Sequence, residues 1–186
     1  MWPRRLTAVT LSARSITLEA WGRFLASDEC RRVVRQQLTG PPHLVSAPTW
    51  VEMLQAATER LPTALALVDV GVPGLPLAYV NAAWERLTGY SRHEVLGRNA
   101  RFLQGESTEE AAVAQIVQSV RECRSCEVCV SNYRKDGGRF RNALSLHPVR
   151  DSSGEYRYVI GLASDADGDA AQQARLALVR KLLPRT

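Results

Sequence analysis

The chain has 186 residues, of which 45% are hydrophobic, and a formal net charge of +5. This length suits one domain with additional helices, and the apolar fraction is large enough for a packed core, which excludes a chain that is disordered overall. The basic residues are dispersed along the chain without an aromatic–basic stripe, so the composition does not favour a nucleic-acid partner.

The first 60 residues predict a helical extension. Leu18, Trp21 and Leu25 have helical spacing, and a second helix ends at Gly40-Pro41-Pro42. The capping-box pattern Thr49-x-x-Glu52 indicates a third helix. The apolar face of this third helix comprises Val51, Leu54, Thr58 and Leu61. We interpret these stripes as surfaces that pack against the main domain or against a partner chain.

A different pattern begins at residue 61. Strands are predicted over residues 64–68 and 77–80, separated by a turn-rich segment. A short helix over residues 81–88 is ended by Gly89. The capping boxes Ser91-x-x-Glu94 and Ser107-x-x-Glu110 indicate two further helices. The second of these helices has an apolar face formed by Val113, Ile116, Val117 and Val120.

Three more strands are predicted at residues 127–133, 139–149 and 156–163. An Asp-Gly pair at Asp136-Gly137 joins the first two as a hairpin, and a turn at Asp151–Gly154 joins the second and third. The order predicts an α+β fold with short helices on one face of an antiparallel sheet. We expect a C-terminal helix over residues 166–186, capped by Asp167 or Asp169, and no effector domain after it.

The cysteines Cys123, Cys126 and Cys129 form a C-x-x-C-x-x-C pattern that invites a metal or iron–sulfur interpretation. In a strand, however, side chains separated by an odd number of residues lie on opposite faces. Cys126 and Cys129 would therefore point apart, and we expect inert thiols without a metal. The fourth cysteine, Cys30, lies in the extension. We expect no signal peptide and therefore no secretory disulfides. No apolar run is long enough to span a bilayer, so we expect a cytoplasmic protein without a membrane partner.

One motif points to a family. Residues Gly97–Gln104 read G-R-N-A-R-F-L-Q, which resembles the signature G-R-N-C-R-F-L-Q of light-oxygen-voltage (LOV) domains, a branch of the PAS superfamily. The segments Tyr79–Ser91, Asn132–Gly137, Pro148–Asp151 and Tyr158–Gly161 also resemble this family. The resemblance implies a PAS fold with a five-stranded antiparallel sheet over residues 61–165, and it implies a bound flavin.

The flavin contacts implied by the resemblance fall on two hairpin strands and on the signature. Asn132 and Asn142 match residues that hydrogen-bond the polar edge of the flavin ring, where an amide offers a donor and an acceptor. Asn99 and Gln104 match contacts to the ribityl chain and ring edge, and Arg101 matches a phosphate clamp. We expect an apolar wall from strand positions on the same faces. This wall comprises Val128, Val130, Leu144 and Leu146.

The sequence departs from the family pattern at three positions. Ala100 occupies the position of the cysteine that bonds the flavin in light, and a methyl group cannot act as that nucleophile. Ala163 stands where the family has a glutamine that responds to the flavin, and Val117 stands where many members have a second phosphate arginine. The expected cofactor is FMN, with riboflavin or FAD as alternatives. A natural difference and an engineered change at residue 100 both fit the sequence.

Two functions of different classes remain after these observations. The first is a flavin-binding blue-light or redox sensor of the short LOV type, without adduct formation and without enzyme activity. It would fluoresce, and it would signal through flavin photoreduction and altered helix packing or homodimerisation through the terminal helices. Candidate electron donors, by sequence proximity, are Tyr79, Trp84, Tyr90 and Tyr133. The second is a PAS dimerisation or interaction module without photochemistry, working through Trp21, Leu25, Leu178 and Leu182. Scattered histidines and no nucleophile–base pair argue against an enzyme.

Overall fold

The structure is a computed structural model that describes residues 50–150 and 155–168. The helices expected before residue 49, the turn at 151–154 and the helix expected after residue 168 lie outside the described residues. In the described part, no helix is both long enough and apolar enough to cross a membrane.

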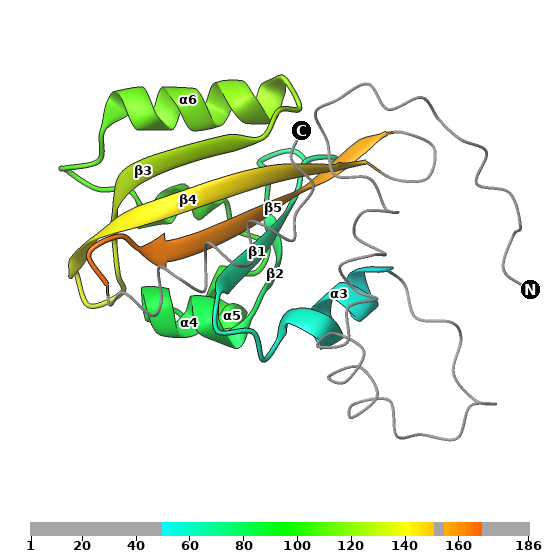
Figure 1. Cartoon of the computed structure of the whole chain (residues 1–186), viewed down its shortest axis with the longest axis horizontal. Helices are drawn as coiled ribbons and strands as arrows, with labels where there is room; N and C mark the ends of the chain where they lie inside the picture. The colour runs from blue at the N-terminus through cyan, green and yellow to red at the C-terminus, as the bar shows by residue number, and fades with distance from the viewer. Residues whose placement is uncertain (1–49, 151–154, 169–186) are drawn as a thin grey trace, which may run out of the picture.

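A five-stranded antiparallel sheet forms the centre of the domain, as predicted. Its strands are β1 (Ala64–Asp69), β2 (Leu77–Val80), β3 (Cys126–Tyr133), β4 (Arg139–Arg150) and β5 (Tyr156–Asp165). The strand order is β2-β1-β5-β4-β3, so the first and last parts of the domain meet along the β1–β5 pair. The β3–β4 hairpin turns at Gly137, whose φ of 85° is a backbone conformation that glycine adopts without strain. The long β4 and β5 strands cross the whole molecule (Figure 1).

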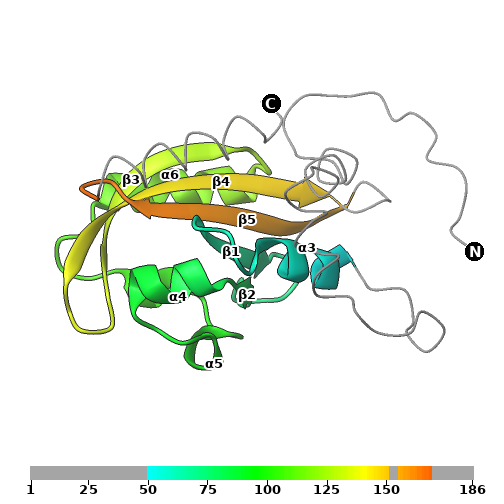
Figure 2. The ribbon, with the colours of Figure 1, turned by 60° about the horizontal axis from the view of Figure 1, so that its bottom comes forward.

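Short helices follow β2 on one side of the sheet. They are α4 (Ala82–Thr88), α5 (Arg92–Val95), the 3-10 helix η1 (Ala100–Leu103) and α6 (Glu110–Arg121). α4 begins at the N-cap Asn81 and ends at Gly89, as predicted, and the Ser91–Glu94 capping box is present in α5. α6 lies beside β3, whereas α4 and α5 lie near β1 and β2 (Figures 1 and 2).

The predicted start of α6 was wrong. No Ser107–Glu110 capping box forms; the helix begins at Glu110, with Glu109 as its N-cap. Glu109 instead accepts hydrogen bonds from the backbone N–H and the hydroxyl of Ser131, at 2.7 and 3.0 Å. Thr108 donates its hydroxyl to the Ser131 carbonyl at 2.7 Å. Thr108 and Glu109, rather than the predicted capping pair Ser107 and Glu110, therefore attach the start of α6 to β3.

The remaining described helix, α3 (Trp50–Thr58), belongs to the N-terminal extension and packs on the other face of the sheet. Leu54 and Ala57 are buried there against Leu65, Leu67 and residues of β4 and β5. The apolar face predicted for this helix is therefore confirmed, because Leu54 and Thr58 are fully buried and Val51 and Leu61 pack against the same cluster.

Polar contacts connect α3 with the helices of the opposite face. Tyr79 on β2 donates its hydroxyl to Glu59 at 2.8 Å, and Arg92 at the start of α5 forms ion pairs with both Glu59 and Glu85. Burial is the main cause that raises the pKa of Tyr79 well above its ordinary value, so this phenol remains a hydrogen-bond donor at all physiological pH values.

Candidate functional site

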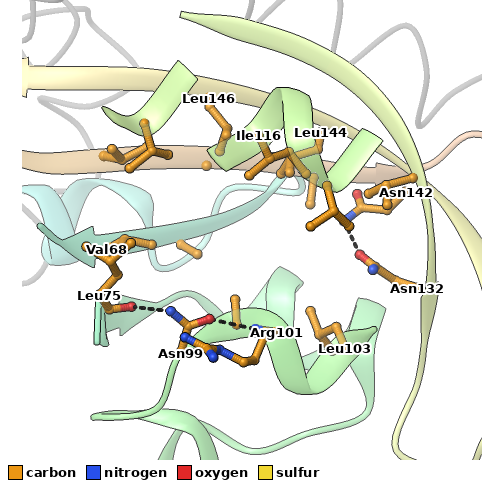
Figure 3. A pocket seen from close by; sticks show the side chains of 18 of the residues that line it. Val68, Leu75, Asn99, Arg101, Leu103, Ile116, Asn132, Asn142, Leu144 and Leu146 are labelled. Atoms are coloured by element: carbon orange, nitrogen blue, oxygen red, sulfur yellow. Dashed lines mark hydrogen bonds between the residues drawn. The ribbon is translucent and has the colours of Figure 1, made fainter. Parts of the chain in front are cut away.

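A cavity of about 510 Å³ lies between the sheet and the helices α4, η1 and α6. Its size is that of a pocket for a cofactor or a drug-sized molecule. Most of its lining is aliphatic. The aliphatic lining residues include Val68, Leu75, Leu77, Leu103, Val113, Ile116, Val120, Leu146 and Val159. Figure 3 shows Leu144 and Leu146 on one side of the cavity and Asn99, Arg101 and Leu103 on the opposite side.

All the candidate site residues from the sequence except Val128 line this one cavity. The set comprises Asn99, Ala100, Arg101, Gln104, Val130, Asn132, Asn142, Leu144, Leu146 and Ala163. They come from the η1 segment and from three different strands, so the fold brings together positions up to 64 residues apart (163 − 99). Val128, predicted for the same wall, packs instead in the adjacent apolar cluster around Cys126.

The polar corner of the cavity is formed by Asn132 and Asn142. Asn142 pairs with Val130 across the β3–β4 ladder and Asn132 pairs with Phe140, so the two amides are diagonal neighbours on one face. Asn142 donates its Nδ2–H to Asn132 Oδ1 at 2.9 Å (Figure 3). Both residues are buried, with exposed fractions of 6% and 4%. The Oδ1 of Asn142 is buried and has no hydrogen-bond partner in the described part of the chain.

An unpaired buried acceptor costs about 1–3 kcal/mol. Because Asn142 lines the cavity, its Oδ1 is available to a ligand N–H there. The corner therefore fits a ligand that presents a polar edge with at least one donor, while the leucines and valines around it fit an apolar ring system.

Asn99 and Gln104 lie at the two ends of η1. The Oδ1 of Asn99 accepts the backbone N–H of Arg101 at 3.0 Å, and its Nδ2 donates to the Gly74 carbonyl at 2.6 Å. Asn99 thus caps η1 and holds the loop before β2 against it (Figure 3). Gln104, the C-cap, is exposed at the edge of the cavity. The sequence did not predict that Asn99 would cap η1 and bond the loop before β2.

Charge at the cavity comes from two arginines. Arg101 in η1 and Arg121 in the last turn of α6 both line it and are both exposed. Neither guanidinium group has a hydrogen-bond or ion-pair partner among the described residues, whereas Arg92, Arg134 and Arg157 are paired with carboxylates. No described lining residue is acidic. The entrance therefore carries net positive charge and favours an anionic group.

Sequence reasoning missed Arg121. The signal was present, because Arg121 follows Val117 by four residues and belongs to the same helical face as Val113 and Val120. A basic residue in the last turn of a helix is already explained by the helix dipole, so there was no separate reason in the sequence to place Arg121 at the cavity.

Small side chains widen the cavity next to η1 and the central strands. Ala100, Ala66, Gly161 and Ala163 all line it. β1 and β5 contribute three of these residues, and Ala66 pairs directly with Gly161 across the β1–β5 ladder. Small residues on adjacent strands leave a flat patch on the sheet, which suits a planar ring.

The described cysteines do not line the cavity. Cys126 is buried against Leu146 and Val159, which line the cavity, but is not itself a lining residue. Cys129 lies on the face of β3 opposite to Cys126, where Arg141 donates to its sulfur at 3.3 Å. The predicted separation of Cys126 and Cys129 is confirmed. Cys123 follows α6 with a φ of 51°, and burial raises the pKa of its thiol. In the described part of the chain, no group of His, Cys, Asp or Glu side chains is arranged to hold a metal ion.

Among the aromatic residues considered as electron donors, Trp84 is the one that lines the cavity. Tyr79 is hydrogen-bonded toward α3, and Tyr90 packs edge-on against Phe102 with ring centroids 5.0 Å apart. Tyr133 contacts Gly105 and accepts the backbone N–H of Ser107. Proximity in sequence could not distinguish these four residues, because they belong to different elements: Tyr79 to β2, Trp84 to α4, Tyr90 to the segment after α4, and Tyr133 to β3.

Comparison with known proteins agrees with this architecture. A family model described as a PAS domain matches residues 67–166. The chain is 41% identical over 123 residues to Blue-light-activated histidine kinase 2 of Erythrobacter litoralis, a match that covers 66% of this chain and 36% of that protein. The chain thus spans about a third of this relative, and the similarity includes no other part of the kinase.

Solved structures extend the comparison to the fold. The LOV domain of the Erythrobacter litoralis EL346 blue-light activated histidine kinase is 44% identical, with a TM-score of 0.56, and the match covers 57% of this chain and 98% of that domain. The Rhodobacter sphaeroides LOV protein is 32% identical, with a TM-score of 0.64, and the match covers 71% of this chain and 76% of that protein. The chain therefore belongs to the PAS family and contains a LOV domain related to those of blue-light receptors.

Proposed function

We propose that the cavity binds a flavin and that the domain is a sensory module responding to blue light or to flavin redox state. The observation that carries this proposal is the Asn132–Asn142 corner, where a buried acceptor has no protein partner. A flavin has an N–H and carbonyl groups on its pyrimidine edge and an apolar benzenoid end. The corner and the aliphatic wall match these two ends, and the residues of this chain therefore fit the cofactor that its family implies.

FMN is the flavin that the entrance favours. A terminal phosphate can accept charge-assisted hydrogen bonds from the unpaired guanidinium groups of Arg101 and Arg121. Riboflavin offers no charge to them. FAD would place its phosphate between the ring and an adenosine group that must extend out of the cavity. Many family members have a second phosphate arginine where this chain has Val117. Arg121, one helical turn further along α6, can thus supply that guanidinium group.

The cysteinyl–flavin adduct is absent from the proposed mechanism. Ala100 has no nucleophilic atom, and the described lining contains no sulfur. Cys126 and Cys129 do not line the cavity. Light would then act by reducing the flavin, which changes the charge and protonation of its ring.

Output would pass to the flanking helices. Asn81 hydrogen-bonds the carbonyl of Thr58 at the end of α3 and the N–H of Trp84, which lines the cavity. A change at the cavity can therefore alter the packing of α3 through one buried side chain. We include homodimerisation through the terminal helices in this proposal, as the step that would carry the signal further.

The experiment compares wild type with Ala100→Cys. Both proteins are purified, reconstituted with FMN and exposed to a blue-light pulse. We expect the wild-type flavin band to persist, and the A100C band to bleach and recover in the dark. Bleaching of the wild type would contradict the missing adduct, and an A100C protein that binds FMN but never bleaches would contradict the assignment of residue 100.

A second experiment tests signalling. Wild type is illuminated anaerobically with a soluble reductant, and hydrogen exchange in α3 and the oligomeric state are measured. Unchanged exchange and unchanged size on flavin reduction would refute sensing. A protein that remains colourless after reconstitution with FMN would favour the PAS interaction module instead.

A further inference from the structure

Trp84 is distinctive among the described residues that line the cavity. It is the one aromatic side chain there and the one with an easily oxidised group, because that lining contains no tyrosine, cysteine or methionine. Trp84 is 3% exposed, and it packs in the apolar cluster with Val80, Leu87 and Phe140. It is therefore adjacent to whatever ligand fills the cavity.

The protein holds Trp84 firmly at this place. Trp84 lies in the first turn of α4, and its backbone N–H donates to the Oδ1 of Asn81 at 3.0 Å. Asn81 is fully buried, and its other hydrogen bonds reach Leu65, Thr58 and Thr63 on neighbouring elements. The buried Asn81 side chain thus joins β1, the end of α3 and the first turn of α4, and it fixes the backbone that carries the indole.

We infer that Trp84 is the electron donor that quenches the photoexcited flavin. This inference rests on the proposed function, because it needs a flavin in the cavity. On excitation, one electron leaves the indole ring of Trp84 and reduces the flavin, which leaves an indole radical cation. In the dark, the same electron returns to the indole, so no other reactant is consumed.

The surroundings of Trp84 favour return of the electron over lasting charge separation. Charge separation persists when a base removes the N–H proton of the indole radical cation, because the product is a neutral indole radical. The described cavity lining contains no carboxylate and no imidazole that could take that proton, and its charged members are the cationic Arg101 and Arg121. Without a soluble reductant, the radical therefore stays a cation and recombines with the reduced flavin. A soluble reductant that reduces the indole radical cation first leaves the flavin reduced, which is the state that the proposed signalling requires.

The test is the fluorescence lifetime of bound FMN in wild type, Trp84→Phe and Tyr90→Phe. Tyr90 is a matched control, because it is oxidisable and packs against the same apolar cluster but does not line the cavity. We expect the lifetime to lengthen severalfold in W84F and to stay at the wild-type value in Y90F. Equal lifetimes in wild type and W84F would overturn the inference.

Transient absorption of the wild-type protein provides a readout that needs no variant. We expect an indole radical cation to form as the excited flavin decays, and to vanish as the ground-state flavin recovers. A wild type that binds FMN but forms no indole radical would overturn the role of Trp84 alone. A wild type that binds no FMN would overturn the proposed function together with this inference.

Discussion

Asn142→Ala tests the polar corner of the cavity. In the flavin-free protein the change has two opposing effects, because it removes the unpaired Oδ1 and also removes the donor to Asn132 Oδ1. We expect these to leave the free energy of unfolding within about 1 kcal/mol of wild type. In the complex, the flavin edge loses a buried partner, which costs about 1–3 kcal/mol, or about 5- to 150-fold in Kd.

The assay is calorimetric titration with FMN, accompanied by urea unfolding of the flavin-free protein. Ser145→Ala is the control, since Ser145 is fully buried on β4 but bonds His147 at 2.8 Å and does not line the cavity. S145A should lose stability without a change in the Kd for FMN. A Kd for N142A within about twofold of wild type, a difference of only ~0.4 kcal/mol, would refute the placement of the ring edge at this corner.

Three further changes test other parts of the structure. Arg121→Gln should reduce the preference for FMN over riboflavin by about fivefold, as expected for an exposed charge-assisted contact worth about 1 kcal/mol. Titration with both flavins measures the ratio of the two Kd values. Arg124→Gln should leave this ratio unchanged, because the Arg124 guanidinium pairs with Glu122 outside the cavity. Asn81→Ala removes four hydrogen bonds made by one buried side chain and should lower the free energy of unfolding by about 3 kcal/mol. The loss should be about 1 kcal/mol for Asn99→Ala, which removes a half-buried cap. Equal losses in urea unfolding would contradict this ranking. Hydrogen bonds from Lys135 and from Ser91 lower the pKa of Glu94 from 4.5 to about 2, so its contribution to stability is present above pH 4.5 and is lost as the pH falls toward 2. In thermal melts, the stability difference between wild type and Glu94→Gln should therefore shrink between pH 4.5 and pH 2. A difference that stays constant over this interval would count against the ion pair.

Local patterns predicted the strands of the sheet, and the resemblance to LOV domains predicted the polar residues of the cavity. The alternation of β3 assigns Val130 to the same face as Asn132, because strand side chains repeat every two residues. The same rule separated Cys126 from Cys129. Asn132 and Asn142 themselves were named by the resemblance to LOV domains. The ends of α4 were also predictable, since Asn81 and Gly89 act through bonds within a few residues of themselves.

Features that depend on distant partners were not predictable in this way. Glu109 and Thr108 bond Ser131, more than twenty residues away, and this contact sets the start of α6 in place of the local capping box. Arg121 reaches the cavity because α6 lies over β3, and Trp84 because α4 lies beside β1. The resemblance assigned Asn99 to a ligand contact, and it did not predict the hydrogen bonds of this amide to the backbone of Gly74 and Arg101.

The central claim is that this cavity binds a flavin. Its most direct test is the absorption spectrum of the purified protein after reconstitution with FMN and removal of unbound flavin. The account predicts a structured blue flavin band that N142A weakens at limiting FMN and that a blue-light pulse does not convert to an adduct. A folded wild-type protein that retains no flavin band after this treatment would contradict the claim.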